Sequence, residues 1–298
     1  QALMYFEAFT ERRTLPSATD VLAIAGAVGW TDIDLPRKDF FDTGDGEWNT
    51  GLNWSGGQTP DNTDQVQVRH GGDVEMVGDG QAGTLDIHAG NRVFTGAHRL
   101  TVSGTVSIGP SGLTESRLSA SNASGECILL GDLQIGLGGV AAADGGVISV
   151  SGTITNEGII QATNGGLFDA VTGLDSANAI FVGGSGVLRT GGFGLTMQPL
   201  SVLTIEDSGS TVDVSTGMIQ DGQLTIKNRG QLIVGNSIDA GVNDWSEGDF
   251  QDAVVQVGGQ LRLGVNRNAH LKSVRSDTVV GSLTSVGHGS SSTLDMRG

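Results

Sequence analysis

Residues 202–234 read VLTIEDSGSTVDVSTGMIQDGQLTIKNRGQLIV, and this stretch decides the fold class. It contains three short segments in which apolar and polar residues alternate, at 202–205, 223–226 and 231–234. Alternation with a period of two predicts a β-strand with one buried face, and the Gly, Asn, Asp and Ser residues between the segments predict turns. The stretch therefore predicts short strands joined by tight corners.

The same alternation recurs along most of the chain, with further segments at 84–88, 99–103, 132–135 and 147–150. Glycine doublets such as Gly165-Gly166 recur beside these segments, which is typical of corners where neighbouring backbones approach closely. Comparable segments start roughly ten to twenty residues apart, which fits one face of a coil of about twenty residues. We therefore predict an all-β fold, a parallel β-helix (β-solenoid) over residues 41–298, in preference to a β-sandwich.

The composition fits a thin core. Of the 298 residues 49 are glycine, while 37% are hydrophobic and 5% are aromatic. So few aromatic residues cannot fill a thick core, but small aliphatic side chains from successive strands can stack in ladders with glycine at the corners. Cys127 is the single cysteine, so no intrachain disulfide is possible, and the Ile-Leu-Leu that follows it predicts a buried, unreactive thiol.

The chain is strongly acidic, with 33 acidic and 16 basic residues and a formal net charge of -17. It lacks the basic stripe that a phosphate backbone requires, so we predict no nucleic-acid partner, and an anionic membrane surface is disfavoured for the same reason. No run of about eighteen apolar residues occurs, so no membrane-spanning helix is expected. An acidic, lysine-poor surface fits an extracellular protein that meets divalent cations.

The first forty residues differ from the rest, and we treat residues 1–40 as a separate segment. Ser17 and Asp20 stand at capping-box spacing before apolar residues at helical intervals, which predicts one short helix in an otherwise irregular segment. This segment would cap the β-helix or dock on a neighbouring subunit. The same stretch can also be interpreted as the remnant of a signal peptide.

Residues 42–68 contain an ordered series of residue types. Trp48 is followed by Asn-Trp-Ser-Gly-Gly at 53–57, by Pro60 and Asp64, and then by an alternating Val-x-Val segment. This series resembles the opening of autotransporter-associated and related bacterial surface β-helix repeats. The resemblance implies an extracellular parallel β-helix in which the two tryptophans cap the open end of the first coil, and it brings no catalytic residues with it.

An oxygen-rich turn at residues 42–47 is a candidate calcium site. Its sequence, Asp-Thr-Gly-Asp-Gly-Glu, places the carboxylates of Asp42, Asp45 and Glu47 around two glycines. The bidentate glutamate that ends an EF-hand loop is missing, but hard cations favour such turns. We expect a calcium ion here to tie the N-terminal segment to the first coil.

Residues 236–252 interrupt the alternation and predict an inserted loop. Loops that project from a repetitive scaffold commonly carry its binding role. The calcium ligands predicted in this loop are Asp239, Asp244 and Asp249. The predicted contacts to a ligand or partner are the aromatic residues Trp245 and Phe250 and the following cations Arg262 and Arg267. The alternative is a solvated loop that Trp245 holds against the stack.

Patterns that would indicate catalysis are weak. Glu206 and Asp207 are adjacent carboxylates, but consecutive residues of a strand face opposite sides of a sheet, and the Ser-Gly that follows them predicts a corner. The Gly-His-Gly at 287–289 resembles an element of β-helical polygalacturonases, yet three residues match by chance in a glycine-rich chain. We predict no catalytic residues and no enzymatic activity.

These observations favour a non-enzymatic structural or adhesive protein at the cell surface or in the extracellular space. Such a protein would be the β-helix subunit of a surface layer, sheath, fibre or adhesin stalk, with copies of itself or a cell-surface glycan as partners and Ca²⁺ as the one expected cofactor. The alternative is a polysaccharide-binding or polysaccharide-degrading β-helix, a lyase or glycosidase, with a groove beside residues 236–252. A third possibility is a monomeric fragment of a larger autotransporter passenger domain.

Overall fold

The chain divides into two units, Gln1–Arg37 and Lys38–Gly298. The computed structural model describes residues 37–40, 45–55, 57–69, 71–109, 114–240, 242, 246–263, 269–286 and 293–297. The short helix predicted within residues 1–40 lies outside the described residues. The second unit is all-β, and its described strand pairs are parallel, apart from one isolated antiparallel bridge between Ser121 and Gly145.

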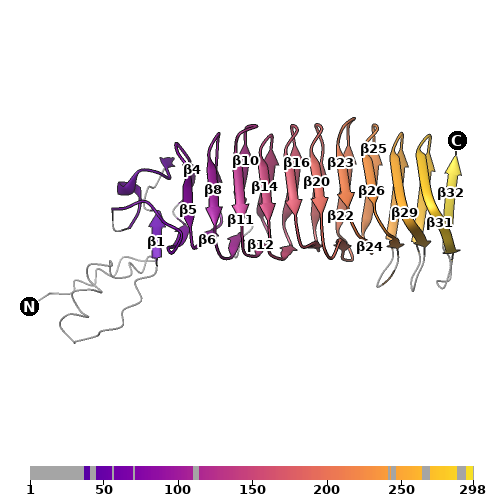
Figure 1. Cartoon of the computed structure of the whole chain (residues 1–298), viewed down its shortest axis with the longest axis horizontal. Helices are drawn as coiled ribbons and strands as arrows, with labels where there is room; N and C mark the ends of the chain where they lie inside the picture. The colour runs from indigo at the N-terminus through magenta and orange to yellow at the C-terminus, as the bar shows by residue number, and fades with distance from the viewer. Residues whose placement is uncertain are drawn as a thin grey trace, which may run out of the picture. The chain divides into compact units, whose positions relative to one another are not determined.

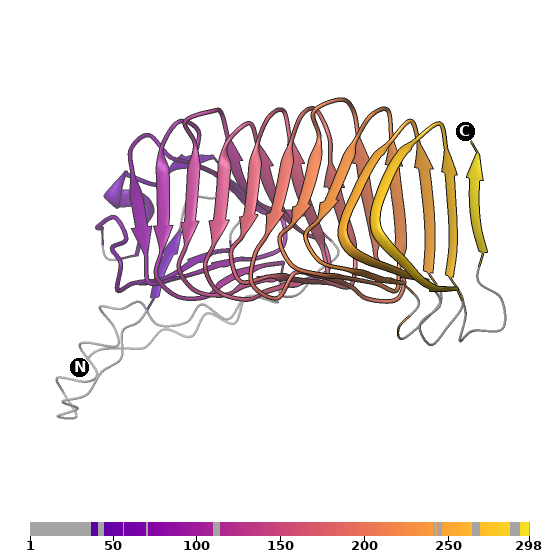
Figure 2. The same cartoon turned by 45° about the vertical axis from the view of Figure 1, so that its right-hand side comes forward.

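The strands of the second unit form three columns, in which each strand pairs with its counterpart in the neighbouring coils (Figures 1 and 2). Column 1 contains β5 (Gly80–Ala82), β8 (Arg99–Val102), β11 (Glu126–Leu129), β14 (Val147–Val150), β17 (Leu167–Ala170), β20 (Val187–Thr190), β23 (Thr211–Val214) and β26 (Gln231–Val234). Column 2 contains β1 (Arg37–Phe40), β3 (Gln65–Val68), β6 (Thr84–Ile87), β9 (Val106–Ile108), β12 (Leu133–Ile135), β15 (Ile154–Asn156), β18 (Leu174–Ser176), β21 (Leu195–Met197), β24 (Met218–Gln220) and β27 (Ile238–Ala240). Two longer strands, β29 (Val254–Leu263) and β31 (Asp277–Val286), run through columns 1 and 2.

Column 3 forms a separate 12-stranded sheet. It contains β2 (Gly46–Glu47), β4 (Gly72–Glu75), β7 (Asn91–Phe94), β10 (Ser116–Ser121), β13 (Gly139–Asp144), β16 (Ile159–Thr163), β19 (Ala179–Val182), β22 (Val202–Glu206), β25 (Gln223–Lys227), β28 (Ser246–Gln251), β30 (Ala269–Val274) and β32 (Thr293–Arg297). One coil is therefore one strand from each column, and the predicted parallel β-helix is confirmed.

The register gives the length of a coil. Val147 pairs with Leu167, and Leu167 pairs with Val187, so these coils take twenty residues each, as the sequence predicts. The alternating segments that we predicted as strands at 147–150, 223–226 and 231–234 lie in β14, β25 and β26. Local alternation was sufficient to find these strands because each has one inward and one outward face.

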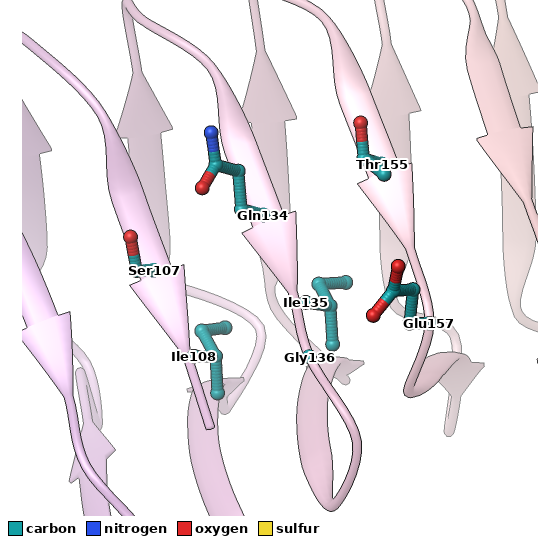
Figure 3. A pocket seen from close by; sticks show the side chains of 7 residues that line it. All are labelled: Ser107, Ile108, Gln134, Ile135, Gly136, Thr155 and Glu157. Carbon is teal, nitrogen blue, oxygen red and sulfur yellow. The ribbon is translucent and has the colours of Figure 1, made fainter. Parts of the chain in front are cut away.

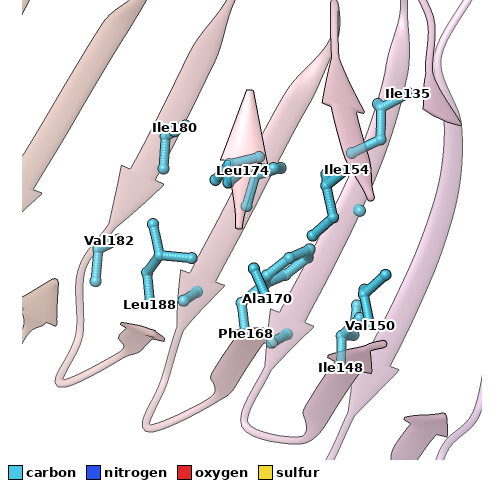
Figure 4. Close-up of a cluster of buried hydrophobic side chains, with 14 of the residues drawn as sticks. Ile135, Ile148, Val150, Ile154, Phe168, Ala170, Leu174, Ile180, Val182 and Leu188 are labelled. Carbon is cyan, nitrogen blue, oxygen red and sulfur yellow. The ribbon is translucent and has the colours of Figure 1, made fainter. Parts of the chain in front are cut away.

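The core lies between the three columns. It is built from ladders of inward side chains, in which each side chain stacks on the one at the equivalent position of the next coil. In column 3, for example, Ile160, Ile180 and Leu203 are register partners and are all buried. Figure 4 shows side chains from the three columns meeting in the interior, among them Phe168 and Leu174. Burying one such aliphatic side chain stabilises the fold by about 1.5–3 kcal/mol, and the ladders repeat this gain in each coil. Cys127 is one of these core residues, as predicted.

Glycine is required where the chain turns from column 3 into column 1. Gly166 and Gly186 each precede a column 1 strand, and a Cβ atom at either position would lie 2.1 Å from a backbone oxygen of the preceding coil, that of Ala143 or Ala162. Several other residues at this corner adopt positive φ, including Asn164 at 52° and Asp207 at 79°. Asn and Asp tolerate this conformation better than other side chains, which explains why they share the corners with glycine.

Two tryptophans pack at the start of the described β-helix. Trp48 follows β2, and Trp54 follows the short 3-10 helix η1 (Gly51–Asn53). Both indoles are buried, their ring centroids lie 4.9 Å apart in an edge-to-face arrangement, and Trp54 Nε1 donates a hydrogen bond to the Trp48 carbonyl at 2.6 Å. The capping role that the resemblance implies for these two residues stays a prediction.

The prediction of an inserted loop at 236–252 is wrong for most of the described residues in this range, because they form strands. β27 and β28 lie within this range, and Ile238, Ala240 and Phe250 face the core. Gly248 hid the pattern, because it occupies an inward ladder position between the apolar residues Leu224 and Leu271.

Candidate functional site

A hollow lies on the outer face of column 2. It has a volume of about 320 Å³ and is lined by Ser107, Ile108, Gln134, Ile135, Gly136, Thr155 and Glu157. Three strands contribute to it, β9, β12 and β15, each with the pattern of a polar residue between two inward residues. We call this feature the column 2 hollow.

The polar side chains of the column 2 hollow come from equivalent positions in three successive coils. Gln134 is the register partner of Ser107 on one side and of Thr155 on the other. In Figure 3 these three side chains project from the same side of neighbouring strands, and Glu157 lies at the end of β15. Because paired strands lie about 4.8 Å apart, the hollow presents one polar group per coil along the axis of the stack.

Within the described residues, the side chains of Ser107, Gln134, Thr155 and Glu157 have no hydrogen-bond or ion-pair partner. The two coils that precede the hollow differ, because Gln67 Nε2 donates to Asp86 Oδ2 at 3.4 Å. The hollow is therefore a stretch of column 2 whose polar groups are free to bind a ligand.

Several outward polar groups of column 2 beyond the hollow are paired. Gln198 Nε2 donates to both carboxylate oxygens of Asp175, at 2.8 and 2.9 Å. Arg262 binds Asp239 through two hydrogen bonds, from Nε at 2.6 Å and from Nη2 at 2.7 Å. These pairs occupy several of the outward polar groups of column 2 on either side of the hollow.

A smaller hollow of about 190 Å³ lies beside the N-terminal tryptophans. Asp61 and Asp79 line it, but Asp61 Oδ1 accepts hydrogen bonds from the backbone N–H and hydroxyl of Thr63, and Asp79 Oδ1 accepts from the backbone N–H of Arg99. These carboxylates already order the turns around them.

Charged side chains elsewhere on the described surface mainly connect neighbouring coils. Six of the seven described ion pairs join residues of adjacent coils: Arg92–Asp73, Arg99–Glu126, Lys227–Glu206, Arg262–Asp239, Lys272–Asp249 and Arg275–Asp252. Five of these are direct register partners on paired strands. The charges therefore brace the stack.

Two of the predicted calcium ligands at the N-terminal turn, Asp45 and Glu47, already accept hydrogen bonds from the protein. Asp45 Oδ1 accepts a hydrogen bond from the backbone N–H of Asp73 at 3.2 Å, and Glu47 Oε2 accepts one from the Thr50 hydroxyl at 2.9 Å. Asp42 lies outside the described residues. Within the described residues no three His, Cys, Asp or Glu side chains gather closely enough to suggest a metal centre.

The residues predicted as a site at 236–252 do not form one cluster. Phe250 is only 2% exposed and packs in the core, so its prediction as a ligand contact is wrong. Asp239 and Arg262 bind each other, and Asp249 accepts a hydrogen bond from Gln251 at 3.1 Å. Asp244, Trp245 and Arg267 lie outside the described residues.

The described residues that were considered for catalysis take part in contacts that stabilise the fold. Glu206 forms an ion pair with Lys227 at 2.6 Å, and the positive φ of Asp207 places it in a corner, as predicted. Burial, together with the neighbouring Glu126 carboxylate, raises the pKa of the Cys127 thiol far above its ordinary value, so this residue stays protonated. The Gly-His-Gly at 287–289 lies outside the described residues.

The column 2 hollow was missed by sequence reasoning, although a signal was present. Residues 106–108, 133–135 and 154–156 read Val-Ser-Ile, Leu-Gln-Ile and Ile-Thr-Asn, each with a polar residue between two inward positions. Aligning these triplets as rungs of one column would have placed their central residues side by side. The spacing between the triplets varies, so the alignment becomes visible only with the register known.

The fold defines a parallel β-helix protein with three strands in each coil. Comparison with protein-family models, with curated proteins and with solved structures gives no match. The resemblance of residues 42–68 to autotransporter-associated repeats therefore stays a prediction, while the β-helix that it implies is present. In the described part of the chain, no helix has the length and apolar character needed to cross a membrane.

Proposed function

We propose that this chain is a non-enzymatic structural or adhesive protein of the cell surface or extracellular space, whose β-helix serves as a rigid rod. The observation that carries the proposal is the bracing of each coil by its neighbours. Parallel strand pairing, core ladders and inter-coil ion pairs all act along the same axis. Such a stack resists bending and extension because each coil is paired and packed against the coils on either side of it.

The acidic composition supports an extracellular location and an assembly that responds to calcium. A net charge of -17 makes copies of the chain repel one another, and divalent cations would reduce this repulsion. The partly free carboxylates near the N-terminal turn, those of Asp45 and Glu47, are the proposed calcium contacts. Copies of the chain are the proposed partners of the rod.

Negative-stain electron microscopy and light scattering of the purified chain, across a calcium titration, test this proposal. We expect rods that associate into filaments or sheets as calcium rises and that separate again after addition of a chelator. Isolated rods at every calcium and protein concentration would contradict self-association. Filaments that are indifferent to the chelator would support the rod and contradict the calcium contacts.

The non-enzymatic part of the proposal needs its own measurement. The chain is incubated with neutral and uronate-containing polysaccharides, and new reducing ends and unsaturated products are measured. We expect neither to appear above the level without protein. Release of either product, and its loss in a heat-denatured control, would show hydrolase or lyase activity and contradict the proposal.

A further inference from the structure

The column 2 hollow has the chemistry of a carbohydrate site, and we propose that it binds a linear neutral oligosaccharide. The assignment rests on the proposed function, since it names the ligand class of an adhesive rod. It differs from a site at residues 236–252, because the hollow lies on the coils that contain β9, β12 and β15.

The polar groups of the hollow require a ligand that both donates and accepts hydrogen bonds. The hydroxyls of Ser107 and Thr155 and the amide of Gln134 can each do both, whereas the Glu157 carboxylate only accepts. Sugar hydroxyls meet this requirement, because each offers one donor and two acceptor lone pairs. A ligand that only accepts hydrogen bonds would leave Glu157 without a partner.

The charge of the hollow disfavours ionic ligands. No basic side chain lines it, and Glu157 would repel a phosphate, a sulfate or a uronate. One carboxylate among neutral groups is also a poor cage for calcium, which takes about six to eight oxygen ligands, commonly with several carboxylates. The ligand class that fits the hollow is therefore a neutral molecule that is rich in hydroxyl groups.

The register of the strands favours an extended ligand that lies along the stack. Ser107, Gln134 and Thr155 are direct register partners, so their polar groups form a row across the strands at intervals of about 4.8 Å. The apolar residues Ile108 and Ile135 also line the hollow, so apolar groups lie next to the row. Polar groups beside apolar surface are what a sugar ring, with its hydroxyl edges and C–H faces, requires.

Isothermal titration calorimetry of the full chain with cellohexaose, xylohexaose, mannohexaose and chitohexaose tests the assignment. Hexagalacturonate serves as the anionic probe and calcium chloride as the ionic probe. We expect at least one neutral hexasaccharide to bind and hexagalacturonate to bind at least about tenfold more weakly. Binding of none of the neutral probes, or equal binding of hexagalacturonate, would overturn the assignment.

Variants locate the binding on the protein. Gln134→Ala and Thr155→Val each remove hydrogen-bonding groups from the row and should weaken binding about five- to tenfold. Gln256→Ala is the matched control, because Gln256 is an exposed glutamine on the outer face of column 1 and should leave the affinity unchanged. Unchanged affinity in both hollow variants would overturn the site even if the chain binds sugar.

Sugar binding and filament formation are measured separately, so the carbohydrate site and the proposed self-associating rod can fail independently. Circular dichroism and thermal melting check that each variant keeps the β-helix, and Thr155→Val suits this purpose because valine favours strands. Filament formation with no sugar binding would overturn the carbohydrate site alone. Sugar binding that accompanies isolated rods would support the site and contradict self-association.

Discussion

The coils at residues 126–206 and those at residues 231–275 share the same three-strand turn, but they differ at the corner that precedes column 1 and in the number of ion pairs on their surface. In the first region Gly166 and Gly186 let backbones approach so closely that no side chain fits. In the second region Ala253 stands where Gly166 and Gly186 stand, before a column 1 strand. Surface charges are prominent there, since three ion pairs join one coil to the next.

Close backbone packing at glycine occurs in both regions, since a Cβ at Gly258 would lie 2.4 Å from the Gly235 oxygen, and the C-terminal coils add ion pairs to it. Close backbone packing depends on dispersion and hydrogen bonding over short distances and is insensitive to salt. Ion pairs at the surface contribute little each and are screened by salt. We therefore expect the C-terminal coils to lose stability in high salt to a greater extent than the central coils.

The largest effect is expected for Phe250→Ala in the second region. The ring of Phe250 helps to fill the space left by Gly248, so its removal leaves a cavity in the core and should destabilise the fold by about 3–5 kcal/mol. Phe193→Ala is the matched control, because Phe193 is 87% exposed and its removal should change stability by less than about 0.5 kcal/mol. Urea denaturation measures the stability of both variants. If the two variants unfold at the same urea concentration, Phe250 is not a core residue and could act as a surface contact.

Gly186→Ala should give the next largest effect, in the central region. The new Cβ would overlap the carbonyl of Ala162, and the neighbouring backbones would have to separate at a cost of about 1–3 kcal/mol. Gly217→Ala is the control, because a Cβ there meets its nearest atom, the Ser237 backbone oxygen, at an ordinary 3.4 Å. If both variants unfold at the same urea concentration, close backbone packing does not hold the central coils together.

Arg262→Gln should have a smaller effect that depends on salt. The side chains of Arg262 and Asp239 are 41% and 22% exposed, so solvent screens the pair and its loss should cost no more than about 1 kcal/mol. The difference from the unchanged chain should shrink in about 1 M sodium chloride, where charges are screened within about 3 Å. Within the described residues Arg189 forms no ion pair, so Arg189→Gln is the control. A loss that persists at high salt would contradict an electrostatic role.

The smallest effect is expected for Asp132→Asn in the central region, and it should depend on pH. Asp132 Oδ1 accepts hydrogen bonds from the backbone N–H and the hydroxyl of Thr153 in the next coil, which lowers the pKa of its carboxyl below the ordinary value. A lowered pKa in the folded state means that the charged carboxylate stabilises the fold above its ordinary pKa. This stabilisation is lost as the pH falls through the lowered pKa.

Urea denaturation of both chains from neutral to acidic pH measures this effect. We expect Asp132→Asn to be the less stable chain at neutral pH and the difference to close in acid. A constant difference across the pH range would show that the charge of Asp132 contributes nothing to the contact between these coils.

Most of the fold could be predicted from local sequence, and the exceptions have identifiable causes. The strands at 147–150 and 231–234 were found because strict alternation reports one buried face. β28 was missed because two of its inward positions hold Ser246 and Gly248 in place of apolar side chains. The helix predicted within residues 1–40 stays a prediction.

The candidate site was much less predictable than the fold. The acidic residues Asp239 and Asp249 drew attention by their type, yet their carboxylates bind side chains close to them in the fold. Gln134 belongs to an unremarkable triplet, and its importance comes from lying between Ser107 and Thr155 in the register. Residue type alone therefore pointed to the wrong part of the surface.

The sequence by itself determined the all-β class, the coil of about twenty residues, the glycine corners and the burial of Cys127. These properties depend on neighbours along the chain, because alternation and backbone conformation are local. The tertiary structure alone decided which polar side chains form hydrogen bonds or ion pairs with one another and which have no partner. Most of those pairs join residues of adjacent coils, and only the register of parallel strands brings such distant positions together.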